Sequence, residues 1–196
     1  ELIYKYNNSE SSFWAGNEYL FFENKDIRAA NTGIQFIELY DLYNNYLFTN
    51  FSRKSRPYTY NPDINGNFLI TAIDAENTSI EADYAWIHFS LILDELKDKS
   101  VHIYGNFNNY STDDSTKMTY NASRGVYENS LLLKQGFYNY KYVVVDNNNR
   151  LDEGAISGNF YQTENNYKVL VYYRDLGARY DKIVGIGEAS SVNISN

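Results

Sequence analysis

Cysteine is absent from the 196-residue sequence. The absence excludes a disulfide framework and any metal site built on thiolates. It does not identify the cellular compartment, because many periplasmic proteins also lack cysteine. No apolar run approaches the roughly 18 residues that a membrane-spanning helix needs. The chain begins at Glu1-Leu2-Ile3-Tyr4 without methionine or a signal-peptide pattern, so we expect a piece of a longer protein in which Leu2–Tyr4 forms a strand.

Positive charge is scarce. The 17 Lys and Arg residues against 25 Asp and Glu residues give a formal net charge of -8 and a pI of about 4.8. A nucleic-acid groove needs clustered Lys and Arg side chains to neutralise phosphates, so this balance argues against a nucleic-acid partner. The densest basic cluster, Arg53-Lys54-Ser55-Arg56, is expected to be a solvated loop before Pro57.

Catalytic motifs are scarce as well. His88 and His102 both lie in predicted strands and lack the spacing of a metal site. Gly185-Ile186-Gly187 lacks the third glycine and the helix of a phosphate loop, and no Gly-x-Ser-x-Gly elbow is present. Three carboxylate pairs are typical of solvated turns: Asp94-Glu95, Asp113-Asp114 and Asp152-Glu153. The sequence therefore predicts a protein that is not an enzyme, with no catalytic residue, cofactor or metal.

Aromatic residues, in contrast, are abundant: they make up 17% of the chain, with 21 Tyr and 11 Phe. The clearest pattern runs from Met118 to Asp146. Tyr138, Tyr140 and Tyr142 recur at every second position, which predicts a strand, because a helix would scatter them around its axis. We expect this strand to form a hairpin with the run Val126–Leu133, joined by the turn Lys134-Gln135-Gly136.

Similar alternation predicts short strands along most of the chain, with almost no helical periodicity. The predicted strands are Ile34–Tyr40, Tyr46–Phe51, Phe68–Ala72, Tyr84–Leu93, Val101–Gly105, Tyr167–Tyr173 and Ile183–Ile186. Asn65-Gly66 fits a type I′ turn. The pattern favours an all-β protein built of tandem immunoglobulin-like antiparallel β-sandwiches. The predicted domains are 1–82, incomplete at its N-terminus, and 83–187, which resembles glycogen-binding modules, followed by a flexible tail at 188–196. One larger sandwich or barrel is the alternative.

The stretch from Val101 to Tyr110 resembles the opening strand and loop of starch- and glycogen-binding sandwiches. In those modules an aromatic ring from the loop stacks on the apolar C–H face of a sugar, and asparagine side chains bond to its hydroxyls. A carbohydrate-binding module is therefore the alternative function. The competing interpretation, which we favour, is that Phe107 packs into the sandwich and Tyr110 caps the loop, because the sugar-binding position holds Tyr110 instead of tryptophan.

Several blocks taken in order resemble the type IX secretion system plug protein of Bacteroidota, formerly a domain of unknown function. The blocks are Phe13–Tyr19, Pro57–Tyr60, Asp63–Phe68, Glu81–Phe89, Met118–Asn121, Leu131–Tyr142, Tyr161–Asn165, Val171–Arg174 and Gly177–Asp181. They cover nearly the whole chain, which matches the C-terminal portion of the longer family members. Ala15, where the family tends to have glycine, and Tyr110, where tryptophan is common, depart from the pattern.

The resemblance implies a non-enzymatic periplasmic protein with immunoglobulin-like sandwiches. It would close the periplasmic mouth of the large outer-membrane β-barrel translocon, its protein-transport partner, and would meet the membrane only through that partner. Aromatic rings dominate protein interfaces, so we expect Phe107, Tyr110, Phe160 and Tyr161, from the loops 106–117 and 151–166, to contact the partner. The alternative is that these rings complete the core of the sandwich.

Overall fold

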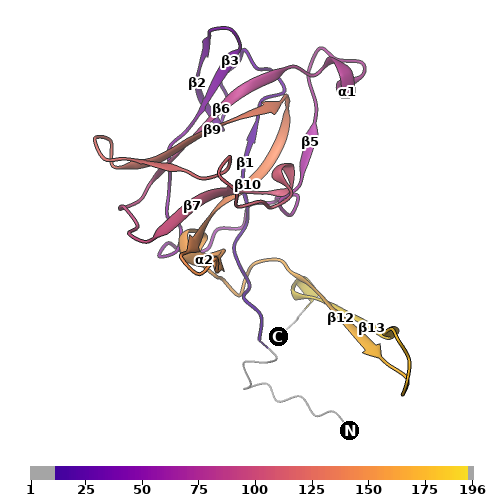
Figure 1. Ribbon diagram of the computed structural model, residues 1–196. Helices are drawn as coiled ribbons and strands as arrows, with labels where there is room; N and C mark the ends of the chain where they lie inside the picture. Colours follow the sequence, from indigo (N-terminus) through magenta and orange to yellow (C-terminus); the bar gives the residue numbers. More distant parts are fainter. Residues whose placement is uncertain (1–11, 194–196) are drawn as a thin grey trace. The chain divides into compact units, whose positions relative to one another are not determined.

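The strands of the chain fall into three sheets in a computed structural model that describes residues 12–193 (Figure 1). The protein is all-β, with a few one-turn helices. It divides into two compact units, one of Asn17–Gly158 and one of Glu1–Gly16 with Asn159–Asn196. The predicted strand at Leu2–Tyr4 lies outside the described residues.

The first unit contains a five-stranded sheet centred on β10 (Gly136–Asp146). The remaining strands of this sheet all pair with β10 in the antiparallel direction. These strands are β1 (Leu20–Glu23), β5 (Phe68–Ile70), β7 (Lys99–Tyr104) and β11 (Leu151–Asp152). The Tyr-rich run that stands out in the sequence is therefore the strand around which this sheet assembles.

A six-stranded sheet forms the other layer of the same unit, in the order β2-β3-β6-β9-β8 with β4 also on β6. β3 and β4 run parallel to β6, and the other pairs are antiparallel. The strands are β2 (Ile34–Leu39), β3 (Tyr43–Leu47), β4 (Asn50–Phe51), β6 (Tyr84–Ile92), β8 (Thr119–Asn121) and β9 (Val126–Lys134).

One hydrophobic core joins the two sheets. Alternate residues of β6 are buried in this core: Ala85, Ile87, Phe89 and Leu91. From the other sheet, Phe22 meets Phe89 edge to face at a centroid distance of 5.8 Å. Tyr140 meets the same Phe89 ring at 5.1 Å. Burial of each such side chain contributes about 1.5–3 kcal/mol, so this interface holds the sandwich together.

The predicted hairpin at residues 126–145 is wrong, although both of its strands exist. β9 pairs with β6 and β8, whereas β10 pairs with strands of the other sheet. Gln135 is the crossing point: its backbone N–H donates to Asp83 (2.8 Å), and its carbonyl accepts from Thr71 (3.2 Å). Glycine is required at position 136, because a Cβ there would lie 2.5 Å from the carbonyl oxygen of Leu69. The chain thus turns from one layer of the sandwich into the other.

The predicted domain boundary after Ala82 is also wrong. β1 and β5, which precede it, pair with β10, and β3 pairs with β6. Residues from both sides of the predicted boundary also pack in one hydrophobic core. Residues 17–158 therefore form one sandwich instead of parts of two in tandem. The predicted second domain, 83–187, is divided as well, at Gly158. The alternative of one larger sandwich is the better description.

Short helices occupy several of the connections. α1 (Thr78–Glu81) lies at the predicted boundary, and the side chain of Asn77 caps it by accepting from the backbone N–H of Ser79. The other short helices are η2 (Asn106–Asn108), α2 (Gly154–Ser157) and η3 (Ser191–Asn193). No helix of the described residues is long and apolar enough to cross a membrane.

The turn predicted at Asn65-Gly66 is confirmed. Both residues have positive φ, 56° and 77°, as a type I′ turn requires. Glycine is needed at position 66 for a second reason, since a Cβ there would lie 2.6 Å from the ring of Tyr19. The turn is followed by β5, but the segment before it is not a strand.

The second unit contains a two-stranded antiparallel sheet of β12 (Asn166–Tyr173) and β13 (Lys182–Ser190), drawn in yellow tones in Figure 1. Both strands were predicted, but β13 is longer than expected. It includes residues 188–190 of the predicted flexible tail, because Asn166, Tyr167 and Lys168 supply pairing partners for them. Residues 194–196 of that tail lie outside the described residues.

Candidate binding surfaces

Phe107, the first of the four predicted partner-contact residues, completes the core of the sandwich. It lies in η2, and its ring meets the Tyr138 ring edge to face at 5.8 Å. Gly105 allows this position, because a Cβ on Gly105 would lie 2.5 Å from the Phe107 ring. Phe107 is thus half-buried against the core, in the position that the packing interpretation of the loop expects.

Tyr110 belongs to an aromatic cluster around Lys141. Its ring lies 5.2 Å from that of Tyr104. The Lys141 ammonium lies 4.9 Å from the centroid of Tyr19 and 5.7 Å from that of Tyr104, and it forms an ion pair with Glu153. Burial raises the pKa of the Tyr19 hydroxyl strongly, so this ring is neutral. The cluster satisfies a nearly buried cation, and Tyr110 joins it through its contact with Tyr104.

Phe160 and Tyr161 lie in the other unit. The backbone N–H of Phe160 donates to the carbonyl of Gly16 at 2.8 Å, and its ring is half-buried. The Tyr161 ring is 86% exposed. Of the four predicted residues, Tyr161 is thus the one whose ring is largely free to meet a partner.

The larger apolar surface, which the sequence analysis did not single out, is the β12–β13 pair, here called the apolar hairpin. Its aliphatic and aromatic side chains are between 40% and 65% exposed: Val169, Leu170, Val171, Tyr172, Tyr173, Ile183, Val184 and Ile186. The strand prediction at 167–173 rested on this very alternation. Alternation of apolar residues predicts a strand but does not reveal whether the face they form is covered.

Both faces of the apolar hairpin are apolar. On one face Val169 and Val171 lie opposite Gly187 and Gly185. The glycines leave the backbone of β13 bare, which permits close approach of another chain. On the opposite face Leu170 pairs with Ile186.

The edges of the apolar hairpin are open as well. No third strand among residues 12–193 pairs with β12 or β13. A two-stranded sheet is marginally stable by itself, and unpaired edges readily accept further strands. The apolar hairpin therefore has the physical properties of an incomplete sheet.

A second surface lies on the outer face of the six-stranded sheet. Phe36 on β2, Tyr46 on β3 and His88 on β6 are direct cross-strand neighbours. Their rings stack, with 4.3 Å between the centroids of Phe36 and Tyr46 and 4.1 Å between those of Tyr46 and His88. We call these three side chains the ring row. A hollow of about 440 Å³ lies against it.

The geometry of the ring row predicts a low pKa for His88. Burial is the main cause that lowers the pKa of this imidazole from 6.5. An NMR titration of the ring protons should place their midpoint below pH 6.5. Because the unfolded chain takes up this proton at a higher pH than the folded chain does, the contribution to stability declines as the pH falls below 6.5. A midpoint at or above pH 6.5 would contradict the burial of this ring.

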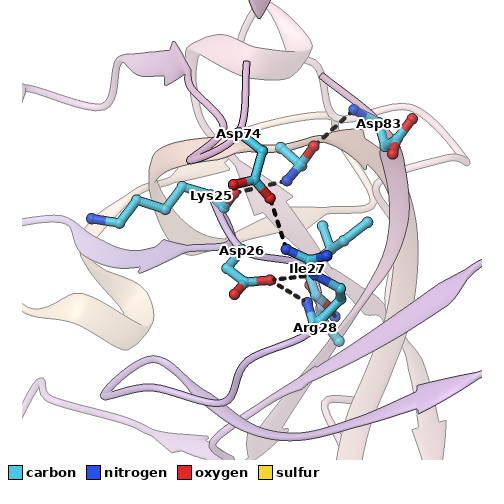
Figure 2. A network of polar contacts seen from close by, with 8 residues as sticks. Lys25, Asp26, Ile27, Arg28, Asp74 and Asp83 are labelled. Atoms are coloured by element: carbon cyan, nitrogen blue, oxygen red, sulfur yellow. Dashed lines mark hydrogen bonds and ion pairs between the residues drawn. The ribbon is translucent and has the colours of Figure 1, made fainter. Parts of the chain in front are cut away.

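A second hollow, of about 240 Å³, lies beside Arg28. Figure 2 shows how its polar groups bond to one another. Arg28 donates to Asp26 at 3.2 Å and to Asp74 at 2.8 Å, which joins the loop after β1 to the loop after β5. Its guanidinium helps to lower the pKa of Asp26, where a hydrogen bond from the Arg28 backbone is the largest cause. The single arginine that lines the hollow is thus already paired with two carboxylates.

The described residues contain no group of three or more His, Cys, Asp or Glu side chains that could hold a metal ion. His102 bonds through its two ring nitrogens to Thr116 (3.0 Å) and Ser100 (2.9 Å). His88 bonds to Asn44 at 2.8 Å. Each histidine is thus held by neutral hydrogen-bond partners.

Comparison with solved structures finds a hypothetical protein from Parabacteroides merdae ATCC 43184, known from its crystal structure. It is 39% identical in sequence, with a TM-score of 0.83 over 91% of this chain and 45% of that one. The chain therefore spans less than half the length of that protein. No protein-family model and no curated protein matches the sequence. The likeness supports the all-β fold and assigns no activity.

Proposed function

We propose that this chain is a non-enzymatic protein-binding module, and that it forms part of a periplasmic plug which closes the mouth of the outer-membrane type IX translocon. The observation that carries the binding role is the apolar hairpin, with two apolar faces and two open edges. Exposed apolar surface of this kind is typical of protein interfaces. The particular partner rests on the family resemblance of the sequence blocks from Phe13 to Asp181.

The two units would have different tasks in such a plug. The sandwich of residues 17–158, which we take to be immunoglobulin-like in this proposal, supplies a rigid body because one aromatic core joins its sheets. The apolar hairpin supplies the binding surface: its edges would accept strands, and Gly185 and Gly187 would let a partner backbone come close. Tyr161, exposed in the same unit as the hairpin, would add an aromatic anchor.

The test is a native pull-down of the tagged full-length protein from its own host, followed by mass spectrometry. We expect a large outer-membrane β-barrel protein among the recovered partners. The double variant Val169→Lys, Val171→Lys should reduce its recovery about tenfold or more, since burying two ammonium groups in an apolar contact is costly. Tyr161→Ala should weaken recovery by a smaller factor.

The matched control places the same two charges elsewhere. Leu39 and Ile92 are exposed on the sandwich, at 61% and 55%, so Leu39→Lys, Ile92→Lys adds equal charge without touching the hairpin. This control should recover the barrel as the wild type does. Equal recovery with the hairpin variant would remove the hairpin from the interface. The absence of any outer-membrane barrel from the wild-type pull-down would refute the plug.

A further inference from the structure

The ring row ends beside a small residue. In the register of the sheet, Phe36 faces Tyr46, Tyr46 faces His88, and His88 faces Ser130 on β9. Directly opposite side chains on one sheet face lie close enough to touch, which explains why the three rings stack. Serine is too small to continue the stack. The face of His88 that is turned away from Tyr46 therefore borders open space.

That space is the hollow of about 440 Å³. Its wall combines the ring row with hydroxyl, amide and charged groups. The polar residues that line it are Gln35, Thr49, Ser90, Arg124, Glu128, Asn129 and Ser130. Ser90 donates its hydroxyl hydrogen to Thr49 at 2.8 Å, so these two are already oriented. A ligand in this hollow would meet a ring face on one side and both donors and acceptors around it.

The hollow carries no net charge. Arg124 and Glu128 are its two charged groups, and they form an ion pair with each other. The pKa of His88 is lowered by burial, so the imidazole is neutral at pH 7. Burial, together with a hydrogen bond to Glu38, raises the pKa of Tyr46 to about 12, so this phenol is neutral too. Neither an anion nor a cation would find an unpaired counter-charge here.

The tautomer of His88 follows from its neighbour. The Asn44 amide nitrogen donates to the carbonyl of Leu42 at 2.9 Å, which turns the Asn44 oxygen toward His88. The Nε2 atom of His88 must then carry the hydrogen that it donates over 2.8 Å to this oxygen. Nδ1 is left as an acceptor. The hydrogen bond to Asn44 thus fixes the orientation of the His88 ring, which stacks on Tyr46.

We propose that the hollow binds a neutral saccharide, with one pyranose ring stacked on the open face of His88 above Ser130. The apolar C–H face of the sugar would extend the ring row. Its hydroxyls would donate to Glu128 and exchange hydrogen bonds with Ser90 and Ser130. An aromatic side chain of a protein partner would also stack, but it would leave these polar groups desolvated without partners. This proposal does not depend on the plug function.

Binding is tested on the full-length protein with three neutral probes, namely maltoheptaose, cellohexaose and mannohexaose. Hexagalacturonate serves as the charged counterpart. We expect saturable binding of at least one neutral probe by saturation-transfer NMR, together with shifted ring signals of His88. Hexagalacturonate should bind at least about tenfold more weakly. Absence of binding by all three neutral probes, or equal binding of the charged one, would overturn the proposal.

Two variants of one residue localise the site. Ser130→Phe adds a fourth ring to the row and fills the space, so we expect a folded protein with at least about tenfold weaker binding. Ser130→Ala keeps the space open and should bind within about threefold of the wild type. His88→Ala removes the stacking face and provides the same test if Ser130→Phe does not fold. Wild-type affinity in a folded Ser130→Phe or His88→Ala protein would place the sugar elsewhere and refute the inference, as would binding of N-acetyltyrosinamide in place of every sugar.

Discussion

Replacing Tyr138 by alanine is expected to destabilise the sandwich by about 4 kcal/mol, within the range found for removal of a large aromatic side chain from a core. The Tyr138 ring is 2% exposed. It stacks on Phe22 at a centroid distance of 5.0 Å and on Phe68 at 5.6 Å, with interplanar angles of 9° and 7°. Phe107 covers its edge. The cavity left by alanine would be lined by rings from several different elements, which cannot all move inward.

Tyr138→Phe is the matched control. It keeps the stacked ring and removes only the hydroxyl, which donates to the carbonyl of Lys134 at 2.7 Å. We expect a loss of about 1 kcal/mol from this hydrogen bond. Urea unfolding followed by tryptophan fluorescence measures both variants. A loss below about 2 kcal/mol for Tyr138→Ala, or equal losses for the two variants, would show that the stack does not organise the core.

Replacing Gln135 by alanine is expected to cost about 2–3 kcal/mol, because this side chain holds the crossing between the two sheets. Gln135 is 8% exposed. Its amide oxygen accepts from the Asp83 backbone at 2.9 Å, and its amide nitrogen donates to the carbonyl of Lys25 at 2.7 Å. Alanine would leave the Asp83 N–H unpaired, whereas the Lys25 carbonyl would keep a second donor in Ile73. The Asp83 N–H therefore accounts for most of the loss.

Gln135→Glu distinguishes the two hydrogen bonds of this side chain, because it keeps the acceptor and removes the donor. The carboxylate can still accept from Asp83, but it faces the Lys25 carbonyl, which is also an acceptor. A proton restores the donor, so we expect the folded state to raise the pKa of this carboxyl above that of the unfolded chain. The protonated carboxyl then stabilises the folded variant at low pH, and this stabilisation is lost as the pH rises through the pKa of the folded state. Urea unfolding from pH 4 to pH 8 would reveal this slope, and a Gln135→Glu protein as stable as the wild type at pH 7 would contradict it.

The candidate binding surfaces depend on contacts that the sequence pattern does not reveal. Phe107 and Tyr110 were expected at an interface because aromatic loop residues often lie there, yet both are engaged within the sandwich. The apolar hairpin was recognised as two strands, but its exposure was not foreseen, since a covered and an uncovered sheet have the same alternation. The ring row combines residues of three strands, and only the register of the sheet brings Phe36, Tyr46 and His88 together.

The region from Val126 to Asp146 shows what the sequence pattern predicts and what contacts with distant residues determine. Its alternation identified both strands and the shared face of Tyr138, Tyr140 and Tyr142, which the structure buries. The same pattern also fitted a hairpin, because strand, turn and strand look alike whether the chain folds back or crosses over. The crossing is set by distant partners: the backbone N–H of Gly136 donates to the Asn24 side chain, 112 residues away.

By itself, the sequence determined the β class, the positions of most strands and the faces that carry apolar side chains. These properties follow from the two-residue period of a strand, which is a local property of the backbone. The tertiary structure alone decided which strands share a sheet, where the chain divides and which apolar faces remain exposed. Those outcomes depend on contacts between residues far apart in the chain. β1, β3 and β5 find their pairing partners only in β10 and β6, far along the chain, and no third described strand pairs with β12 or β13.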